Sequence, residues 1–208
     1  MESKKQSFHF LPAREREIAK LLNKTRIHLD GKKILDVGCG TGGVLRGFVE
    51  MGADPENCFG TDILEYRIEK AKAKNPAINY AMTDGKTLPF ADESFDIIIQ
   101  TTAFSSMENK EARIQNAKEI ERVLKSGGML IWYDMKRNLR NLWSSFPAPI
   151  SKTDLISYFP EMEIIYDKPM HFVAVSPIAK ISPFLAKVTE IFPSILKSHI
   201  LAGFRKKQ

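Results

Sequence analysis

The sequence has few cysteines and no long apolar run. Two cysteines among 208 residues are too few for a disulfide framework, and a crosslink at Cys39 would obstruct the glycine-rich segment around it. No run of about 18 uncharged apolar residues appears, which disfavours a membrane-spanning helix. Residues 1–7 are polar and lack the apolar core of a signal peptide. These absences predict a reduced, cytoplasmic protein.

What remains is the composition of a folded domain. Apolar residues make up 43% of the chain and charged residues 27%, which suits one domain over residues 1–208 with a real core. The net charge of +6 permits an acidic partner such as nucleic acid, phosphate or an anionic membrane surface. The simpler interpretation is that the charge keeps the protein in solution.

Short apolar segments alternate with amphipathic ones along the first two thirds of the chain. The pattern predicts strands at residues 33–37, 57–61, 78–82, 94–100 and 129–133, and helices at 13–28, 43–51, 64–74 and 108–124. This alternation favours a parallel sheet covered by helices on both faces. Beyond residue 134 prolines interrupt the pattern, which predicts helices at 152–159 and 183–191 and strands at 162–166 and 199–204.

A glycine-rich loop follows the first predicted strand. Gly38, Gly40 and Gly43 form G-x-G-x-x-G, which by itself fits a dinucleotide site or an ordinary tight turn. Glycines at this place allow positive φ and let a ligand approach the backbone. Asp36 precedes the loop, and its carboxylate would repel a pyrophosphate but would suit an ammonium or a sulfonium group. The loop therefore favours a cofactor other than NAD.

Two further acids follow the next two strands. Asp62 closes the second strand, where an acid accepts hydrogen bonds from ribose hydroxyls, although it would also serve to cap the next helix. Asp84 follows the third strand, where it would meet an adenine amino group or belong to a simple turn. Because the carboxyl ends of parallel strands meet at one edge, three acids in succession favour a cofactor site.

These segments resemble class I S-adenosylmethionine-dependent methyltransferases of the type 11 branch. The likeness rests on residues 34–42 (ILDVGCGTG), 83–85 (TDG), 88–96 (LPFADESFD) and 119–130 (EIERVLKSGGML). It implies an α/β, Rossmann-like fold: a seven-stranded sheet in the order 3-2-1-4-5-7-6, with the last strand antiparallel and helices on both faces. It also implies three parts within the single domain: an N-terminal helix and lid (1–29), a cofactor-binding core (30–134) and an acceptor-side part (135–208).

The resemblance implies S-adenosyl-L-methionine as the cofactor and assigns residues to it. From the methionine end to the adenine these are Asp36, Gly38, Cys39, Gly40, Gly42, Asp62, Ile63, Asp84, Gly85, and Gln100 or Thr101. Asp62 would hold the ribose, with Ile63 against the adenine face. Asp84 would meet the adenine amino group beside a backbone contact from Gly85, while Gln100 or Thr101 would close the pocket floor.

Methyl transfer from a sulfonium requires mainly that the acceptor be oriented and water excluded, since positioning is worth roughly 7–11 kcal/mol. A general base is needed only for a poor nucleophile. Asp134 and Tyr133, at the end of the fifth strand, are the catalytic candidates, with the alternative that Asp134 positions the next segment. His9 lies between two phenylalanines, which predicts either a lid over the sulfonium or simple packing.

Missing motifs narrow the acceptor to a small molecule. The stretch after the fourth strand reads QTTA rather than [DN]-P-P-[YFW], and no cysteine follows it, so enzymes that methylate nucleic acids are disfavoured. No His/Cys cluster has the spacing of zinc ligands, so no metal is expected. The sequence leaves two alternatives: a cofactor-binding protein that only regulates a partner, and an NAD-dependent oxidoreductase.

The end of the chain is similar to methyltransferases of bacterial surface-polysaccharide gene clusters. The likeness rests on residues 132–140 and 192–207, although the asparagines of the first stretch match only in part. It implies a sugar acceptor whose phosphate would face Arg137 and Arg140, for which the alternative is a solvated loop. The apolar, lysine-dotted residues 172–204 also suggest a weak contact with a membrane surface. The sequence does not indicate an oligomeric state.

Overall fold

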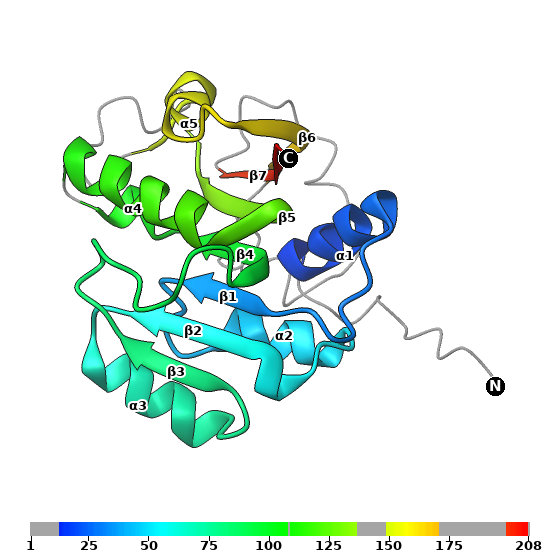
Figure 1. The fold of residues 1–208 in the computed structure, drawn as a ribbon, viewed down its shortest axis with the longest axis vertical. Helices are drawn as coiled ribbons and strands as arrows, with labels where there is room; N and C mark the ends of the chain where they lie inside the picture. Colours follow the sequence, from blue (N-terminus) through cyan, green and yellow to red (C-terminus); the bar gives the residue numbers. More distant parts are fainter. Residues whose placement is uncertain (1–12, 108, 137–148, 171–198, 208) are drawn as a thin grey trace, which may run out of the picture.

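The computed structural model describes residues 13–107, 109–136, 149–170 and 199–207. Within these ranges a seven-stranded sheet has the order β3-β2-β1-β4-β5-β7-β6 (Figure 1). The parallel strands are β1 (Ile34–Val37), β2 (Cys58–Asp62), β3 (Asn79–Met82), β4 (Phe95–Thr101) and β5 (Leu124–Met135). Strand β7 (His199–Lys206) is antiparallel to both β5 and the outer strand β6 (Met162–Met170). The predicted fold, strand order and antiparallel last strand are confirmed.

Helices cover both faces of this sheet. The helices α1 (Ala13–Thr25), α2 (Gly43–Glu50) and α3 (Glu65–Lys74) pack on one face, which we call the α1 face. The helices α4 (Lys110–Val123) and α5 (Lys152–Tyr158) and the short η3 (Phe104–Ser106) pack on the other, the α4 face. A further 3₁₀ turn, η2 (Pro55–Asn57), leads into β2.

The alternation of side chains along each strand decides which face a residue serves. In β5, Ile131 and Tyr133 belong to the core cluster of the α1 face, whereas Trp132 belongs to that of the α4 face. In β1, Ile34 lies on the α1 face and Leu35 on the α4 face. Residues that are neighbours in the sequence are therefore separated by the thickness of the sheet.

Three predicted strands, β5, β6 and β7, are longer than their sequence pattern indicated, and β5 and β6 differ most. Strand β5 begins at Leu124 rather than at the predicted residue 129, and its two glycines lie in a bulge where the register with β4 shifts. The strand predicted at 162–166 continues to Met170 through a second bulge, because β7 supplies pairing partners along its whole length. The helix predicted at 183–191 lies outside the described residues.

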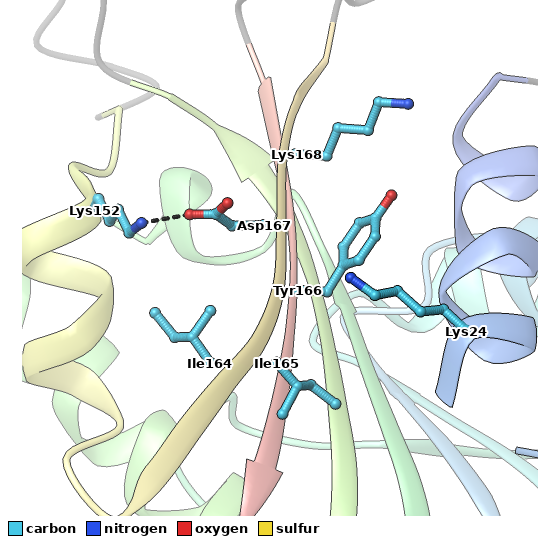
Figure 2. A pocket seen from close by; sticks show the side chains of 7 residues that line it. All are labelled: Lys24, Lys152, Ile164, Ile165, Tyr166, Asp167 and Lys168. Carbon is cyan, nitrogen blue, oxygen red and sulfur yellow. Dashed lines mark hydrogen bonds and ion pairs between the residues drawn. The ribbon is translucent and has the colours of Figure 1, made fainter. Parts of the chain in front are cut away.

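Helix α1 is anchored to the outer strand. Figure 2 shows Tyr166 and Lys168 of β6 on the side of the strand that faces α1. Glu17 accepts hydrogen bonds from Lys168 Nζ at 2.7 Å and from Tyr166 Oη at 3.2 Å, and Lys24 Nζ lies 5.6 Å from the centroid of the Tyr166 ring. Burial raises the pKa of Glu17, but the hydrogen bonds and charges of Lys168 and Lys20 outweigh it and hold that pKa below its usual value. These contacts fix α1 across the sheet.

No helix in the described parts of the chain is both long enough and apolar enough to cross a membrane.

Candidate functional site

The glycine loop lies at the carboxyl ends of the parallel strands, where ligands bind in open α/β sheets. Gly38 has φ 78° and donates its N–H to the carbonyl of Thr61 at 2.8 Å. A Cβ atom on Gly38 would lie 2.8 Å from the Cβ of Ala103, so only glycine lets the loop after β1 meet the turn after β4. Gly42 also has positive φ, and a Cβ atom there would collide with Tyr80. These two glycines are required by conformation and by close approach.

Asp36 is the most unusual side chain at this edge. It is fully buried on β1, and neither carboxylate oxygen has a hydrogen-bond partner within the residues that the structure describes. Burial raises the pKa of Asp36 to about 7, while the charge of Arg14 lowers it and that of Asp62 raises it. A buried carboxylate that lacks a partner is costly, which indicates a group made to meet a ligand.

Asp62 ends β2 and already has partners. One oxygen accepts a hydrogen bond from the Gly40 N–H at 2.9 Å and the other from the Leu64 N–H at 3.0 Å. The Arg67 guanidinium lies 3.6 Å from the first oxygen. Asp62 therefore joins the glycine loop to the start of α3, and its carboxylate lies beside that loop as the sequence predicted. The alternative that Asp62 caps α3 is wrong: Leu64 is the N-cap residue and has no side-chain cap, so the Asp62–Leu64 bond only forms the turn that precedes the helix.

Asp84 forms a turn just beyond β3. One of its oxygens accepts hydrogen bonds from the backbone N–H groups of Lys86 and Thr87, both at 2.8 Å, and these bonds lower the pKa of Asp84. Its neighbour Gly85 lies beside Ile63, since a Cβ atom on Gly85 would be 3.0 Å from Ile63 Cγ2. Ile63 is 58% exposed, unusual for a large apolar side chain. The structure thus brings Ile63 and Gly85 together across two loops.

Gln100 and Asp134 lie together on the opposite side of the sheet, on the α4 face. Gln100 donates to an Asp134 oxygen at 3.3 Å, and the Ser105 N–H donates to the same oxygen at 3.1 Å. The other oxygen accepts from the Met135 N–H at 2.7 Å. Burial raises the pKa of Asp134, against these hydrogen bonds. Asp134 therefore fixes the turn after β4. Thr101, which is 8% exposed, points to the α1 face because side chains alternate along β4.

Comparison with known proteins bears directly on this arrangement. A family model described as a methyltransferase domain matches residues 35–132, which contain the glycine loop and all three acids. The phthiotriol/phenolphthiotriol dimycocerosates methyltransferase of Mycobacterium tuberculosis is 29% identical over 133 residues, 63% of this chain and 47% of the relative. The chain thus spans about half the length of this curated relative.

Solved structures agree on the fold. An S-adenosylmethionine-dependent methyltransferase from Mesorhizobium loti superposes with a TM-score of 0.66 at 17% identity, over 90% of this chain and 96% of that one. Residues 35–132 match the methyltransferase-domain family, and the chain has the fold of class I S-adenosylmethionine-dependent methyltransferases. The [4+2]-cyclase SpnF superposes equally well, with a TM-score of 0.67 at 19% identity over 94% of this chain and 81% of SpnF. The fold alone does not decide the reaction.

Within this methyltransferase fold, Cys39 offers its backbone rather than its thiol. The side chain is buried, and its sulfur would lie 2.9 Å from a Cβ atom placed on Gly60 of β2. Burial, reinforced by the charges of Asp36 and Asp62, raises the pKa of the Cys39 thiol. The sulfur therefore packs against the sheet as a neutral group, which the position of Cys39 inside the glycine motif did not reveal.

Tyr133 points to the same face as Asp36 and has two neighbours that the sequence analysis did not single out. Its ring stacks on His199 with centroids 5.1 Å apart and planes 11° apart, and the Arg14 guanidinium carbon lies 5.8 Å from its centroid. Burial raises the pKa of Tyr133 to about 12 and lowers that of His199 to about 4. Both side chains are thus neutral near pH 7.

The turn after β4 holds a strained residue. Thr102 has φ 56°, a region that β-branched residues rarely adopt, and its N–H donates to the Tyr133 carbonyl at 2.7 Å. Such strain concentrates at functional sites of folded proteins. Nothing in the local sequence signals it, because the turn is held by hydrogen bonds that Thr102 donates to the Tyr133 carbonyl of β5 and that Ser105 donates to the Asp134 carboxylate. Three residues predicted from sequence, His9, Arg137 and Arg140, lie outside the described residues.

A shallow hollow beside the outer strand β6 is separate from these residues. It is lined by Lys24, Lys152, Ile164, Ile165, Tyr166, Asp167 and Lys168 (Figure 2). Lys152 is ion-paired with Asp167, and the bulge at Ile165 places Ile165 and Tyr166 on one side of the strand. None of the site residues predicted from the sequence lines this hollow. Its lysine side chains already contact acids or an aromatic ring.

Proposed function

We propose that this chain binds S-adenosyl-L-methionine and catalyses transfer of its methyl group to a small-molecule acceptor. The observation that carries the proposal is Asp36: a fully buried carboxylate at the mouth of the glycine loop, without a hydrogen-bond partner in the described chain. An ammonium group of a ligand would satisfy both the charge and the hydrogen-bonding capacity of this side chain.

The remaining residues at this edge fit the rest of the same cofactor. Asp62 would take the ribose hydroxyls, because a carboxylate oxygen can accept a further bond beside the one it has from the backbone. Ile63 is exposed where it would cover the adenine, and Asp84 would meet the adenine amino group beside the backbone of Gly85. When bound, S-adenosyl-L-methionine supplies an electrophilic methyl group and a thioether leaving group.

Tyr133 and Asp134 would have different roles in this reaction. The phenol of Tyr133 keeps its proton near neutral pH and would orient an acceptor by donating a hydrogen bond. The Asp134 oxygens are engaged by three groups of the protein, so we propose that Asp134 positions the turn at Ser105. Orientation without a general base suffices for a nucleophilic acceptor.

The finer proposal, that the acceptor is a sugar of a surface-glycan precursor, rests on the sequence resemblance at the end of the chain. Residues 137–140 and 192–198, which carry part of this resemblance and include Arg137 and Arg140, lie outside the described ranges. Both cysteines are free, in keeping with the proposed cytoplasmic location.

Calorimetric titration of the protein with S-adenosylmethionine and with NAD tests the cofactor. We expect binding of the first and none of the second; binding of NAD alone would overturn the proposal. Turnover is then measured with labelled S-adenosylmethionine on a panel of nucleotide sugars, lipid-linked sugars and other small molecules. Tight cofactor binding without methylation of any acceptor would support instead a protein that only regulates a partner.

A further inference from the structure

The loop between β3 and β4 is bound along helix α4 (Figure 1). Its far end is held at Leu88, whose N–H donates to Glu119 Oε2 at 2.8 Å and whose carbonyl accepts from Arg122 Nη2 at 3.0 Å. Its near end is held by Asn116, whose Nδ2 donates to the Gly85 carbonyl at 2.9 Å. Because residues 116, 119 and 122 follow one another at intervals of three on α4, they lie along one side of the helix.

Asn116 acts on the peptide group that joins Gly85 to Lys86. The carbonyl of this group accepts the hydrogen bond from Asn116, and its N–H donates to one carboxylate oxygen of Asp84 at 2.8 Å. A peptide group is planar, so fixing its carbonyl also fixes the direction of its N–H. Glycine at position 85, with φ 74°, restricts this group less than another residue would. Asn116 therefore orients the Asp84 carboxylate through one peptide group.

This asparagine carries a cost to stability. Asn116 is only 1% exposed, and its Oδ1 atom is buried without a hydrogen-bond partner in the described residues. The Gly85 oxygen can only accept, so Nδ2 must face it and Oδ1 is left unpaired. A buried acceptor without a donor destabilises the folded protein, and an apolar side chain would avoid that penalty. The side chain therefore has its use in the bond that it donates to the loop.

We propose that Asn116 is a positioning residue for recognition of the adenine base: by fixing the Gly85–Lys86 peptide group, it directs Asp84 to the adenine amino group. This inference rests on the proposed function, which assigns Asp84 and Gly85 to the adenine. One Asp84 oxygen accepts the bonds from Lys86 and Thr87. The other makes no hydrogen bond with the residues that the structure describes, so it can accept from the amino group.

The test compares S-adenosylhomocysteine with S-inosylhomocysteine, which carries a carbonyl oxygen where adenine carries its amino group. Calorimetry measures the affinity of both for the full chain and for two variants without the donor. Asn116→Leu keeps the branched shape of the side chain, and Asn116→Asp keeps its size. Gln115→Leu is the matched control, because it removes an amide from an exposed position of the same helix. Thermal unfolding checks that each variant folds.

A double-mutant cycle separates positioning from a general structural role. It adds Asp84→Ala and the double variant Asp84→Ala/Asn116→Leu to the same titrations. If Asn116 acts through Asp84, the effects of the two substitutions on the preference for the adenosyl ligand are not additive.

We expect the unmodified protein to bind the adenosyl ligand about tenfold more tightly, because a carboxylate accepts from an amino group and repels a carbonyl oxygen. Asn116→Leu and Asn116→Asp should weaken the adenosyl ligand about tenfold and the inosyl ligand by less than about twofold. Gln115→Leu should change neither affinity. In the Asp84→Ala protein, Asn116→Leu should not reduce the preference further.

Equal weakening of both ligands by the Asn116 variants, or of neither, would overturn the proposal, and so would additive effects in the cycle. An unmodified protein that binds the two ligands alike would also overturn it, but would leave the proposed function supported by Asp36 and Asp62. If the unmodified protein binds neither S-adenosylmethionine nor these two ligands, the proposed function itself fails.

Discussion

Two aspartates at the same edge of the sheet show opposite environments. Asp36 on β1 and Asp134 on β5 are both fully buried, and in both burial raises the pKa. Asp134 accepts hydrogen bonds from Gln100, Ser105 and Met135, whereas neither oxygen of Asp36 has a partner in the described part of the chain. The comparison teaches that burial alone does not distinguish a structural acid from a binding one; the supply of donors does.

The difference follows from the faces of the sheet. Asp134 points to the α4 face, where the turn through η3 brings the Ser105 N–H against it. Asp36 points to the α1 face, where the neighbouring glycine loop uses the N–H groups of Gly38 and Cys39 on the Thr61 carbonyl instead. On the α4 face the protein therefore supplies hydrogen-bond donors to the acid, whereas on the α1 face the described residues supply none to Asp36.

We expect the largest change in stability for Asp134, the acid whose oxygens accept hydrogen bonds from the protein. Asp134→Ala should lower the free energy of unfolding by about 3–5 kcal/mol, because it leaves buried donors of Gln100, Ser105 and Met135 without an acceptor. Denaturant unfolding measures this loss. Asp134→Asn, which keeps the shape and one oxygen, should lose less. A loss below about 1 kcal/mol for the alanine variant would remove the structural role.

Replacing Asp36, the acid without hydrogen-bond partners in the described chain, should instead raise the free energy of unfolding. Because burial raises the pKa of Asp36 to about 7 from 3.8, the folded protein holds a proton that the unfolded chain releases between these values. The free energy of unfolding therefore falls as pH rises through this window. Asp36→Asn stays neutral and, without ligand, should be about 2–4 kcal/mol more stable than the unmodified protein above pH 7.

The Asp36→Asn substitution, which we expect to stabilise the protein, should also weaken its binding of S-adenosylmethionine. Calorimetry at pH 8 should show that Asp36→Asn loses about 2–5 kcal/mol of affinity for S-adenosylmethionine. A variant that binds normally, or is less stable than the unmodified protein above pH 7, would contradict the assignment of Asp36 to the ligand.

Asp62 is an intermediate case. Its oxygens accept hydrogen bonds from the backbone of Gly40 and Leu64, but its carboxylate also lies beside the glycine loop. Asp62→Ala should weaken affinity for S-adenosylmethionine by about 1–3 kcal/mol. Arg67→Gln is the control, because it removes the ion pair at 3.6 Å and keeps the bonds from Gly40 and Leu64. Unchanged affinity of the alanine variant in a titration would exclude Asp62 from the ribose site.

The smallest expected effect concerns the turn that Asp134 holds. Thr102→Gly should raise the free energy of unfolding by about 1 kcal/mol, since glycine adopts φ 56° without strain. Arg26→Gly, at φ 55° but without β-branching, should gain less. Thermal unfolding of both variants checks the difference, and a loss of stability for Thr102→Gly would show that its side chain contributes more than its strain costs.

Much of this fold was predictable because it depends on local pattern. Phe95 and the isoleucines 97–99 predicted a buried strand, the glycines after β1 predicted a turn with positive φ, and the structure has both. The extent of β5 and β6 was not predictable, because their added residues are strand only through pairing with β4 and β7. The candidate site divides in the same way. Acids at strand ends were visible, whereas Tyr133 and Asp134 were grouped although alternation puts them on opposite faces.

The sequence by itself determined the strand-loop-helix order, the class I methyltransferase pattern and the positions of three acids at the carboxyl ends of successive strands. Only the tertiary structure decided which acid has partners, and it brought Arg14 from α1 and His199 from β7 to Tyr133. The physical reason is that periodicity and turn chemistry are local properties of the chain. The donors that satisfy a buried carboxylate come from segments far apart in the sequence, and they meet only when the sheet is assembled.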